Sequence, residues 1–512
     1  MTVLSTAVRS LVVGSCLMAA PLLAADRHEG LPFDPILPPP PEAWPAVIDD
    51  QHPDAVALYD VAWNQAWNHR KSQQGLPQSP YMDEACWGDT IWIWDTCYMS
   101  LFCKYAYETF PGVESLRNFY LPMHGGYQGL ALKIQHPNNP PLFAWVEYDT
   151  FRVTADRAHI EQLIVRDGFL QKHYDWFRRE QRGPRPRYDG DIEDYHWSGR
   201  PSGMDNTPRQ EGRIYWLDAL AQQGLSALYI ARLERQCGRA AEADRWQATY
   251  QKLRDRMNQG YWDDQDGTYY DIERSTGAKI KVLTPASFWP MLAEMCSLEQ
   301  AARMVDLVRR PDLLGGRYPW VSLARNDPRF DAVTGDYWRG GIWLPMAYLG
   351  IKALEKYGYD QVADQTAEAI LEQMTTTWKT YQPATIWECY NPSKPEPSTE
   401  VGRRARPDFC GWSALGPISL YIENHLGIRT VDALVGEVRW DLHLPGRHGI
   451  QRLRFGAVKT DLVYDGVGTV TVTSTAPYTL VLNGERRTIA AGTTTLPSIK
   501  PRPVVDQPHL PR

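Results

Sequence analysis

The 512-residue sequence lacks the signatures of several large protein classes. It has no Gly-rich phosphate loop, no G-x-S-x-G elbow and no H-E-x-x-H helix, so nothing in it predicts nucleotide, serine-hydrolase or zinc-protease chemistry. Its net charge of −7 gives no electrostatic reason to expect a nucleic acid, because phosphate binding needs clustered Lys and Arg. We therefore expect a neutral or small polar partner.

Cysteine is scarce, and its spacing does not suggest a metal site. Eight cysteines occur without a C-x-x-C pair or a Cys/His cluster of zinc-ligand spacing, so we expect neither a metal nor an organic cofactor. The seven cysteines that follow Cys16 are predicted to be buried free thiols. If a disulfide does form, Cys389 and Cys410 are its first candidates, because both lie beside the acid-bearing segment around residue 388.

Long apolar runs are absent beyond the N-terminus. Arg9 precedes an apolar stretch at residues 11–23, and Ala24 and Ala25 follow it, which predicts a secretory signal peptide of residues 1–25. Such a stretch is too short to be a permanent membrane span. We expect a periplasmic or secreted protein without an integral membrane segment, with lipidation at Cys16 as the alternative.

The chain after the predicted signal peptide divides into four parts by its residue pattern. Residues 26–53 form a Pro-rich leader. Over residues 54–430 apolar residues recur at threes and fours, which is typical of helices and, with so few strands, suggests an all-α toroid. Short alternating runs with Asp-Gly and Asn-Gly turns predict a small antiparallel β module at residues 431–500. The Pro-containing tail, residues 501–512, is expected to be frayed.

Aromatic residues are abundant, and two segments combine them with an acid. The 20 Trp and 27 Tyr provide rings that suit apolar sugar faces as well as protein cores. Asp205 and Glu388 each lie among aromatic, small and turn-forming residues, where partial burial raises a carboxyl pKa, and two such acids are a candidate glycosidase pair. By local sequence alone, however, Asp205 is better explained as a turn aspartate, and Glu388 is either a base or a buried hydrogen-bonding strut.

Four motifs resemble those of one enzyme family. In chain order they are IWIWDT, SGMDNTPR, DYWRGGIW and WECYNP. They are similar to the motifs of glycoside hydrolase family 63, which contains inverting α-glucosidases and bacterial relatives that hydrolyse glucosylglycerate or mannosylglycerate. The resemblance extends over roughly residues 80–425. The trehalases of family 37 share it more distantly.

This resemblance implies a fold, a reaction and a set of residues. The fold is an (α/α)6 toroid, or six-hairpin barrel, followed by the β module. The reaction is the exo-acting, inverting hydrolysis of a small glycoside or oligosaccharide, as by an α-glucosidase, with Asp205 as general acid and Glu388 as general base. The implied sugar contacts are Trp94, Asp95, Asn139, Tyr337, Trp338, Gly340, Trp343, Tyr390 and Trp412.

Alternatives stay open at several of these positions. Asp95 precedes a predicted helix and would also serve as its N-cap, and the rings of residues 337–343 would also serve as core packing. Asn139 stands where the relatives commonly carry glutamine, so its side chain is one methylene shorter. Glu84 and Glu193 are expected to be surface acids or supports for other side chains. The alternative functions are a trehalase and a catalytically inactive carbohydrate-binding toroid.

Overall fold

The computed structural model describes residues 33–511 except for 85–87, 182–193, 198 and 210–212. The predicted signal peptide, with the alternative lipidation site Cys16, and Glu193 lie outside the described residues. Among the described residues, no helix combines the length and the apolar character that a membrane crossing needs.

Six helical segments form a closed series of contacts at the centre of the protein. Each packs against the next, α2 against α4, then α8, α10, α12 and η7, and η7 packs against α2. They are apolar on nearly every side, and such helices belong in a core; every residue of α2 and of η7 is buried. The six segments are α2 (Ile93–Cys103), α4 (Phe143–Thr154), α8 (Leu217–Gln236), α10 (Trp289–Leu292), α12 (Leu344–Lys356) and the π-helical η7 (Gly416–His425).

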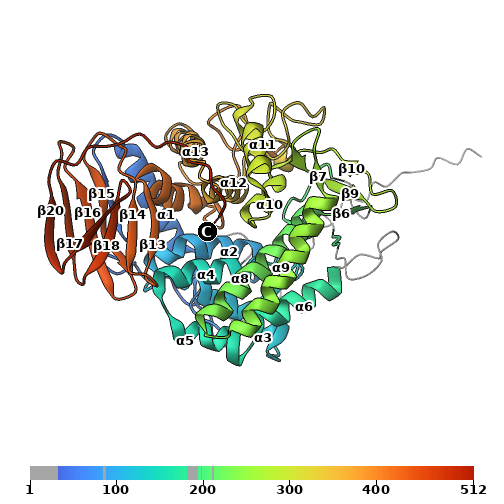
Figure 1. Ribbon diagram of the computed structural model, residues 1–512, viewed down its shortest axis with the longest axis horizontal. Helices are drawn as coiled ribbons and strands as arrows, with labels where there is room; N and C mark the ends of the chain where they lie inside the picture. The colour runs from blue at the N-terminus through green and yellow to red at the C-terminus, as the bar shows by residue number, and fades with distance from the viewer. Residues whose placement is uncertain (1–32, 85–87, 182–193, 198, 210–212, 512) are drawn as a thin grey trace, which may run out of the picture.

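A second set of helices covers this central series. α9 lies along α8, and α13 packs on both α12 and η7 (Figure 1). These helices bury one face only, as their alternation of apolar and polar residues predicts. The helices outside the central series are α1 (Pro53–Asn68), α3 (Arg117–His124), α5 (Arg157–Ile160), α6 (Phe169–Gln181), α7 (Gly199–Ser202), α9 (Ala240–Gly260), α11 (Leu298–Arg309), α13 (Asp360–Thr380) and the shorter η1 (Lys104–Ala106), η2 (Val113–Leu116), η3 (Glu161–Arg166), η4 (Pro285–Phe288), η5 (Tyr337–Arg339) and η6 (Ser413–Leu415).

The loops between helices carry short strand pairs. β6, β9 and β10 form a three-stranded ladder, and β4 pairs in parallel with β5 ahead of α2. These ladders use backbone groups that a loop would otherwise leave unpaired. The short strands are β2 (Arg70–Lys71), β3 (Tyr81–Met82), β4 (Thr90–Trp92), β5 (Lys133–Gln135), β6 (Ile214–Tyr215), β7 (Trp262–Asp263), β8 (Thr268–Tyr269), β9 (Asp271–Glu273), β10 (Lys279–Ile280), β11 (Thr399–Glu400) and β12 (Arg403–Arg404).

The C-terminal β module consists of two sheets, of order β1-β15-β16-β17-β20 and β13-β14-β18-β19, beside the helical part (Figure 1). Its strands alternate buried and exposed residues, as in β17, so each sheet buries one face. The strands are β1 (Ala46–Asp49), β13 (Ile428–Asp432), β14 (Glu437–Trp440), β15 (His448–Phe455), β16 (Val458–Tyr464), β17 (Val470–Ser474), β18 (Tyr478–Leu482), β19 (Glu485–Ile489) and β20 (Gly492–Leu496).

Two features of this module differ from the expectation. β14 and β18 pair in parallel, so the prediction of a purely antiparallel module is wrong at this pair. Three strands of the other sheet intervene between them in the chain, and a connection of that length permits parallel pairing. In addition, β1 from the predicted leader pairs with β15, so the leader contributes an edge strand to the C-terminal module.

The C-terminal tail is bound to the protein surface, so the expectation of a frayed tail is wrong. The backbone N–H groups of Gln507 and His509 donate to the carbonyls of Gly358 and Tyr357, at the turn between α12 and α13. The Asp506 carboxylate accepts hydrogen bonds from the Gln361 backbone N–H and from Arg309. The tail thereby connects the β module to the helical part of the chain.

A buried ion-pair network lies where α2, α12 and η7 end. Lys104 and Lys352 contact Glu423 at 3.2 and 2.7 Å, and Tyr105 and Tyr348 donate to the same carboxylate. Burial alone would raise the pKa of Glu423, but the two ammonium groups and the hydrogen bonds outweigh it and lower this pKa to about 2. A cavity of about 240 Å³ opens at this end of the helices.

We expect Glu423→Gln to lower the free energy of unfolding by about 3–5 kcal/mol near neutral pH, because it leaves two buried lysines without their shared partner. The depressed pKa contributes stability above the unfolded-state value near 4.5, and this contribution is lost as the pH falls through about 2. Urea unfolding from pH 7 to pH 2 should therefore show the wild type and the variant converging. Glu372→Gln, at an exposed pair with Arg317, is the control and should change stability by less than about 1 kcal/mol. Equal losses in the two variants would contradict the prediction.

Candidate active site

Segments that are far apart in the sequence meet at the beginnings of the central helices. Asn139, just ahead of α4, donates its side-chain N–H to the Pro201 carbonyl at 3.1 Å. The backbone of Gly203 packs on the Trp94 ring at the start of α2, where an added Cβ would lie 3.1 Å from ring carbons. Gly203 also has φ +83°, a conformation that favours glycine. The segment around Asp205 is therefore held against the segment of Asn139 and against the start of α2.

Asn206 connects the Asp205 segment to the aromatic segment ahead of α12. Its amide N–H donates to the Asp336 carbonyl at 2.9 Å, and its side-chain oxygen accepts the Trp338 backbone N–H at 2.7 Å. These two bonds satisfy backbone groups of a strained turn, since Asp336 and Tyr337 both have positive φ. The sequence analysis did not single out Asn206, although it directly follows Asp205.

Glu388 is buried and is held by two groups. The Tyr337 hydroxyl donates to its Oε1 at 2.8 Å, and Arg406 contacts the same oxygen at 3.1 Å. The Arg406 backbone N–H donates to Oε2 at 3.3 Å. Burial raises the pKa of Glu388, and Arg406 and the Tyr337 hydrogen bond offset part of this rise. Arg406 lies 18 residues after Glu388, outside every motif, and no sequence pattern indicated it.

Asp205 combines exposure to solvent with a raised pKa. The residue is exposed, yet nearby protein atoms desolvate its carboxyl and raise its pKa to about 7. Arg200 opposes this shift, and the charge of Glu388 adds to it. With this pKa, the Asp205 carboxyl is protonated in part at neutral pH, as a proton donor must be.

Asp95 and Glu84 form a buried carboxyl pair beside these acids. Their side chains are hydrogen-bonded to each other, and burial raises the pKa of Asp95 to about 7 and that of Glu84 well above its usual value. Glu84 is therefore a support for Asp95, one of the two roles expected for it. Asp95 lies in the first turn of α2, while Trp92 occupies the N-cap position, so the N-cap alternative for Asp95 is wrong.

Several buried polar atoms in these segments have no hydrogen-bond partner among the described residues. Buried polar groups are normally paired, so unpaired ones beside the predicted acids are candidate contacts for a polar ligand. They include Trp94 Nε1 and Asn139 Oδ1.

The predicted aromatic residues pack against one another. Trp338 and Trp343 are stacked with ring centroids 4.0 Å apart, and Tyr337 meets Trp343 edge-on at 4.6 Å. Trp412 contacts Trp343 at 5.6 Å and donates its indole N–H to the Glu388 carbonyl at 2.8 Å. These rings lie directly beside Glu388, and their substrate contacts stay a prediction.

Gly340 and Tyr390 have structural roles in the same region. Gly340 has φ +158°, and a Cβ there would lie 2.7 Å from the Asp331 carbonyl oxygen, so the turn requires glycine. The Tyr390 hydroxyl accepts the Trp387 backbone N–H at 3.2 Å, and the backbone of Tyr390 pairs with Ile342. These bonds hold the segment of Glu388 against the segment ahead of α12.

The described cysteines are free thiols, as predicted, and the alternative Cys389–Cys410 disulfide does not form. Cys389 is a buried free thiol and is hydrogen-bonded to Ser398. The Cys410 thiol is directed elsewhere and lies 3.9 Å from the Asp83 carbonyl. Although both cysteines lie near Glu388 in the sequence, their sulfur atoms are not bonded to each other.

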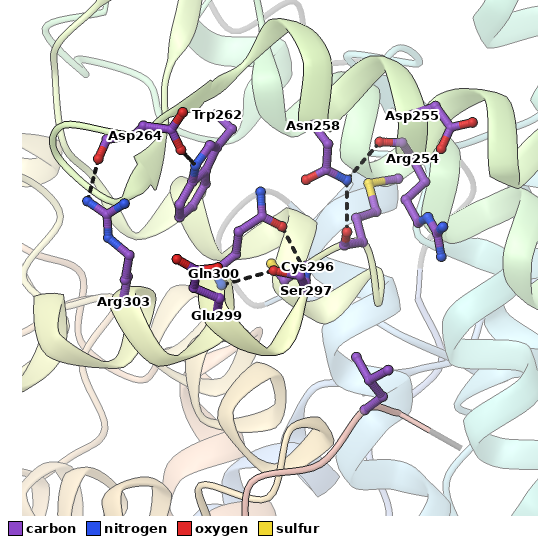
Figure 2. A pocket seen from close by; sticks show the side chains of 12 residues that line it. Arg254, Asp255, Asn258, Trp262, Asp264, Cys296, Ser297, Glu299, Gln300 and Arg303 are labelled. Atoms are coloured by element: carbon purple, nitrogen blue, oxygen red, sulfur yellow. Dashed lines mark hydrogen bonds between the residues drawn. The ribbon is translucent and has the colours of Figure 1, made fainter.

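A separate pocket of about 520 Å³ lies between α9 and α11 and contains none of the predicted site residues (Figure 2). Trp262 and Arg303 both hydrogen-bond to Asp264 at its rim. Polar groups that line this pocket are already hydrogen-bonded to one another, and no predicted site residue lines it. It is therefore not the candidate active site.

Arg209, at the end of the Asp205 motif, is buried between two acids. Its guanidinium makes a bidentate contact with Asp271 at 2.6 and 2.7 Å, and a further bond to Asp218 at 2.7 Å. The guanidinium also lies 4.1 Å from the Trp216 ring centroid. This fork fixes the loop that carries Asp205 on the start of α8. The motif contained Arg209, but its two partners lie outside the motif, 9 and 62 residues further along the chain.

Comparisons with known proteins agree with this geometry. Residues 133–409 match the family described as the mannosylglycerate hydrolase MGH1-like glycoside hydrolase domain. A probable mannosyl-oligosaccharide glucosidase of Schizosaccharomyces pombe is 26% identical over 51% of this chain and 35% of its own length. The mannosylglycerate hydrolase of Rubrobacter radiotolerans is 30% identical over 28% of this chain and 32% of its own length. The alignments thus span about a third of either enzyme.

Solved structures show the same fold. The family 63 mannosylglycerate hydrolase of Thermus thermophilus superposes with a TM-score of 0.54 at 16% identity, covering 71% of this chain and 99% of that one. A sialidase structure superposes with a TM-score of 0.66 at 12% identity, covering 90% of this chain and 41% of that one. Because the family match covers more than half of the sequence, the chain belongs to the MGH1-like glycoside hydrolases, as the motif resemblance to family 63 predicted.

We expect Arg209→Lys to fold and to lower kcat/KM by about 10²-fold on any glycoside that the wild type cleaves, because loss of the guanidinium fork lets the Asp205 loop shift. Arg256→Lys is a matched control, since Arg256 makes an equivalent buried bidentate contact with Asp194 at 2.8 and 2.9 Å away from the motifs. Steady-state kinetics and melting temperatures would be measured for both variants. Equal activity losses in the two would show that the Asp205 loop does not depend on Arg209.

Proposed function

We propose that the protein is an exported, exo-acting, inverting α-glycosidase that hydrolyses a small α-glucoside or a related α-glycoside. The observation that carries this proposal is the contrast between two neighbouring acids. Glu388 is buried and held by a hydroxyl and a guanidinium, whereas Asp205 is exposed and has its pKa raised to about 7. Acids whose environments differ in this way take different roles in glycoside hydrolysis.

The proposed reaction assigns one proton transfer to each acid. Protonated Asp205 donates its proton to the glycosidic oxygen as the bond to the anomeric carbon breaks. Glu388 accepts a proton from a water molecule, whose oxygen forms the new bond on the opposite face of the sugar. Inversion requires room for this water, which corresponds to carboxyl groups roughly 6.5–9.5 Å apart. No group outside these two acids has to donate or accept a proton.

The surrounding residues support the binding of a sugar beside these acids. The unpaired Trp94 Nε1 and Asn139 Oδ1 are a donor and an acceptor for sugar hydroxyls. Burial raises the pKa values of both Glu84 and Asp95, so this pair adds less negative charge to the site than two ionised carboxylates would. We propose that the rings of Trp343 and Trp412 complete the wall of the sugar site.

We also propose that the helical part is an (α/α)6 toroid. Support comes from the closed contact series of α2, α4, α8, α10, α12 and η7, with other helices packed outside it. The predicted signal peptide of residues 1–25 supports export of the protein. The enzymes named among the relatives act on mannosylglycerate and mannosyl-oligosaccharides, so both sugars belong in a substrate screen, together with trehalose.

We expect Asp205→Asn and Glu388→Gln each to reduce turnover by about 10²–10⁴-fold or more, because each removes one proton transfer. Both variants keep the size of the side chain, so the melting temperature should stay close to that of the wild type. The exposed acids Asp312 and Glu372 provide matched controls, Asp312→Asn and Glu372→Gln, which should keep full activity. Retained turnover in either site variant would remove that residue from the mechanism.

The stereochemistry of the first product tests inversion independently. We expect an α-glycoside to release a β-sugar first, because water attacks the face opposite to the leaving group. The measurement is proton NMR of the anomeric signals during the first minutes of a screen of α-glucosides, α-mannosides and glycosylglycerates. Release of an α-anomer would contradict the inverting mechanism, and no turnover of any α-glycoside would favour the inactive carbohydrate-binding alternative.

A further inference from the structure

Asp49, His52 and His425 form a cluster away from the candidate active site. Asp49 ends β1, His52 precedes α1, and His425 is the last residue of η7. One ligand atom from each lies within 4.8 Å of the other two. Asp49 and His425 are 376 residues apart in the chain, so the cluster forms only where the β module meets the helices.

We propose that this cluster binds a zinc ion through Asp49 Oδ2, His52 Nδ1 and His425 Nε2. Two imidazole nitrogens and one carboxylate oxygen are a ligand set that Zn²⁺ accepts, with a water in the fourth position. Half of the His52 side chain is open to solvent, which leaves that fourth position accessible. The sequence analysis expected no metal because it found no C-x-x-C pair or Cys/His cluster of zinc-ligand spacing, and it did not single out these three residues.

The surrounding groups orient these ligands for a metal. Glu368 Oε1 lies 2.7 Å from His425 Nδ1, which directs Nε2 of the same ring to the cluster. A carboxylate behind a ligating histidine is a recurring arrangement in zinc sites. Asp49 Oδ1 accepts the backbone N–H groups of Gln51 and His52 at 3.1 and 3.2 Å, while Oδ2 faces both histidines and also accepts the Tyr421 hydroxyl at 3.4 Å.

The three ligand atoms lie slightly closer together than the ligand atoms around a zinc ion. Asp49 Oδ2 lies 2.7 Å from His425 Nε2 and 2.9 Å from His52 Nδ1, whereas ligand atoms around tetrahedral zinc lie about 3.3 Å apart. The half-exposed His52 side chain can increase its own distance to Asp49, and the Asp49–His425 distance has to widen by about 0.6 Å to hold the ion. On binding, the proton between His425 and Asp49 is released to solvent. The two carboxylates of Asp49 and Glu368 then balance the charge of Zn²⁺.

A bound zinc would join the first strand of the β module to the last central helix. The competing explanation is a hydrogen-bonded network in which a protonated His425 lies between Asp49 and Glu368 without any metal. The two differ in one respect that can be measured, because only the zinc site gives one-to-one metal binding that depends on His52. The proposal is independent of the glycosidase function, since none of these residues belongs to the candidate active site.

The experiment uses the full mature chain after dialysis against EDTA, titrated with ZnCl₂ by isothermal calorimetry and followed by thermal unfolding. We expect one zinc per chain with a Kd of about 1 μM or tighter, and a melting temperature raised by at least about 3 °C under saturation. CaCl₂ should give neither effect, because calcium prefers six or more oxygen ligands.

Variants assign the binding to the cluster. His52→Ala removes a half-exposed ligand without disturbing the core and should weaken zinc binding by at least about 100-fold, and Glu368→Gln should weaken it by about 10–100-fold. His443→Ala, at a histidine outside the cluster, should leave the affinity unchanged. Absence of stoichiometric zinc binding by the wild type, or equal affinity in wild type and His52→Ala, would overturn the proposal in favour of the metal-free network.

Discussion

The closed series of central helices is the constraint on which the other features of the structure depend. Trp94, Asn139, Trp343 and Trp412 lie at or just before the starts of four of these helices, and contacts between their segments bring them together. Lys104, Lys352 and Glu423 lie at the other ends and contact one another. The helices α2, α12 and η7 therefore run in the same direction, and the segments that lead into them arrive at the same end.

The two ends of this helical series have opposite electrostatic character. At the far end, the lysines near the helix C-termini complement the partial negative charge there and pair fully with Glu423 and Asp149. At the site end, Glu84 and Asp95 are buried without a cation and have raised pKa values. Uncompensated acids lower stability, and they are tolerated at sites where a ligand or a reaction uses them. The ion pairs at one end of the helical series thus stabilise the fold, while Glu84 and Asp95 at the other end stay without a paired cation among the described residues.

Long-range contacts of a few polar side chains set the geometry of the site. Asn206 and Arg209 bridge segments from different loops, and Arg406 joins two parts of the long connection between α13 and η6. Loops carry the acids, but these bonds attach the loops to rigid helices, which limits the movement of Asp205 and Glu388 relative to each other. Removing such a bridge changes the position of an acid without changing its chemistry.

The sequence by itself determined the division into a helical part and a β-rich part, because helical and strand periodicity are local properties of the chain. It also determined which motifs carry acids and aromatic rings, and through them the glycoside hydrolase family. Only the tertiary structure decided the pairing of Glu84 with Asp95, of Arg406 with Glu388 and of Arg209 with Asp271. The parallel β14–β18 pair and the docking of the tail were also decided there. The physical reason is the same in each case: a pairing between distant residues depends on where two chain segments arrive in space, and no local pattern of residues encodes that meeting.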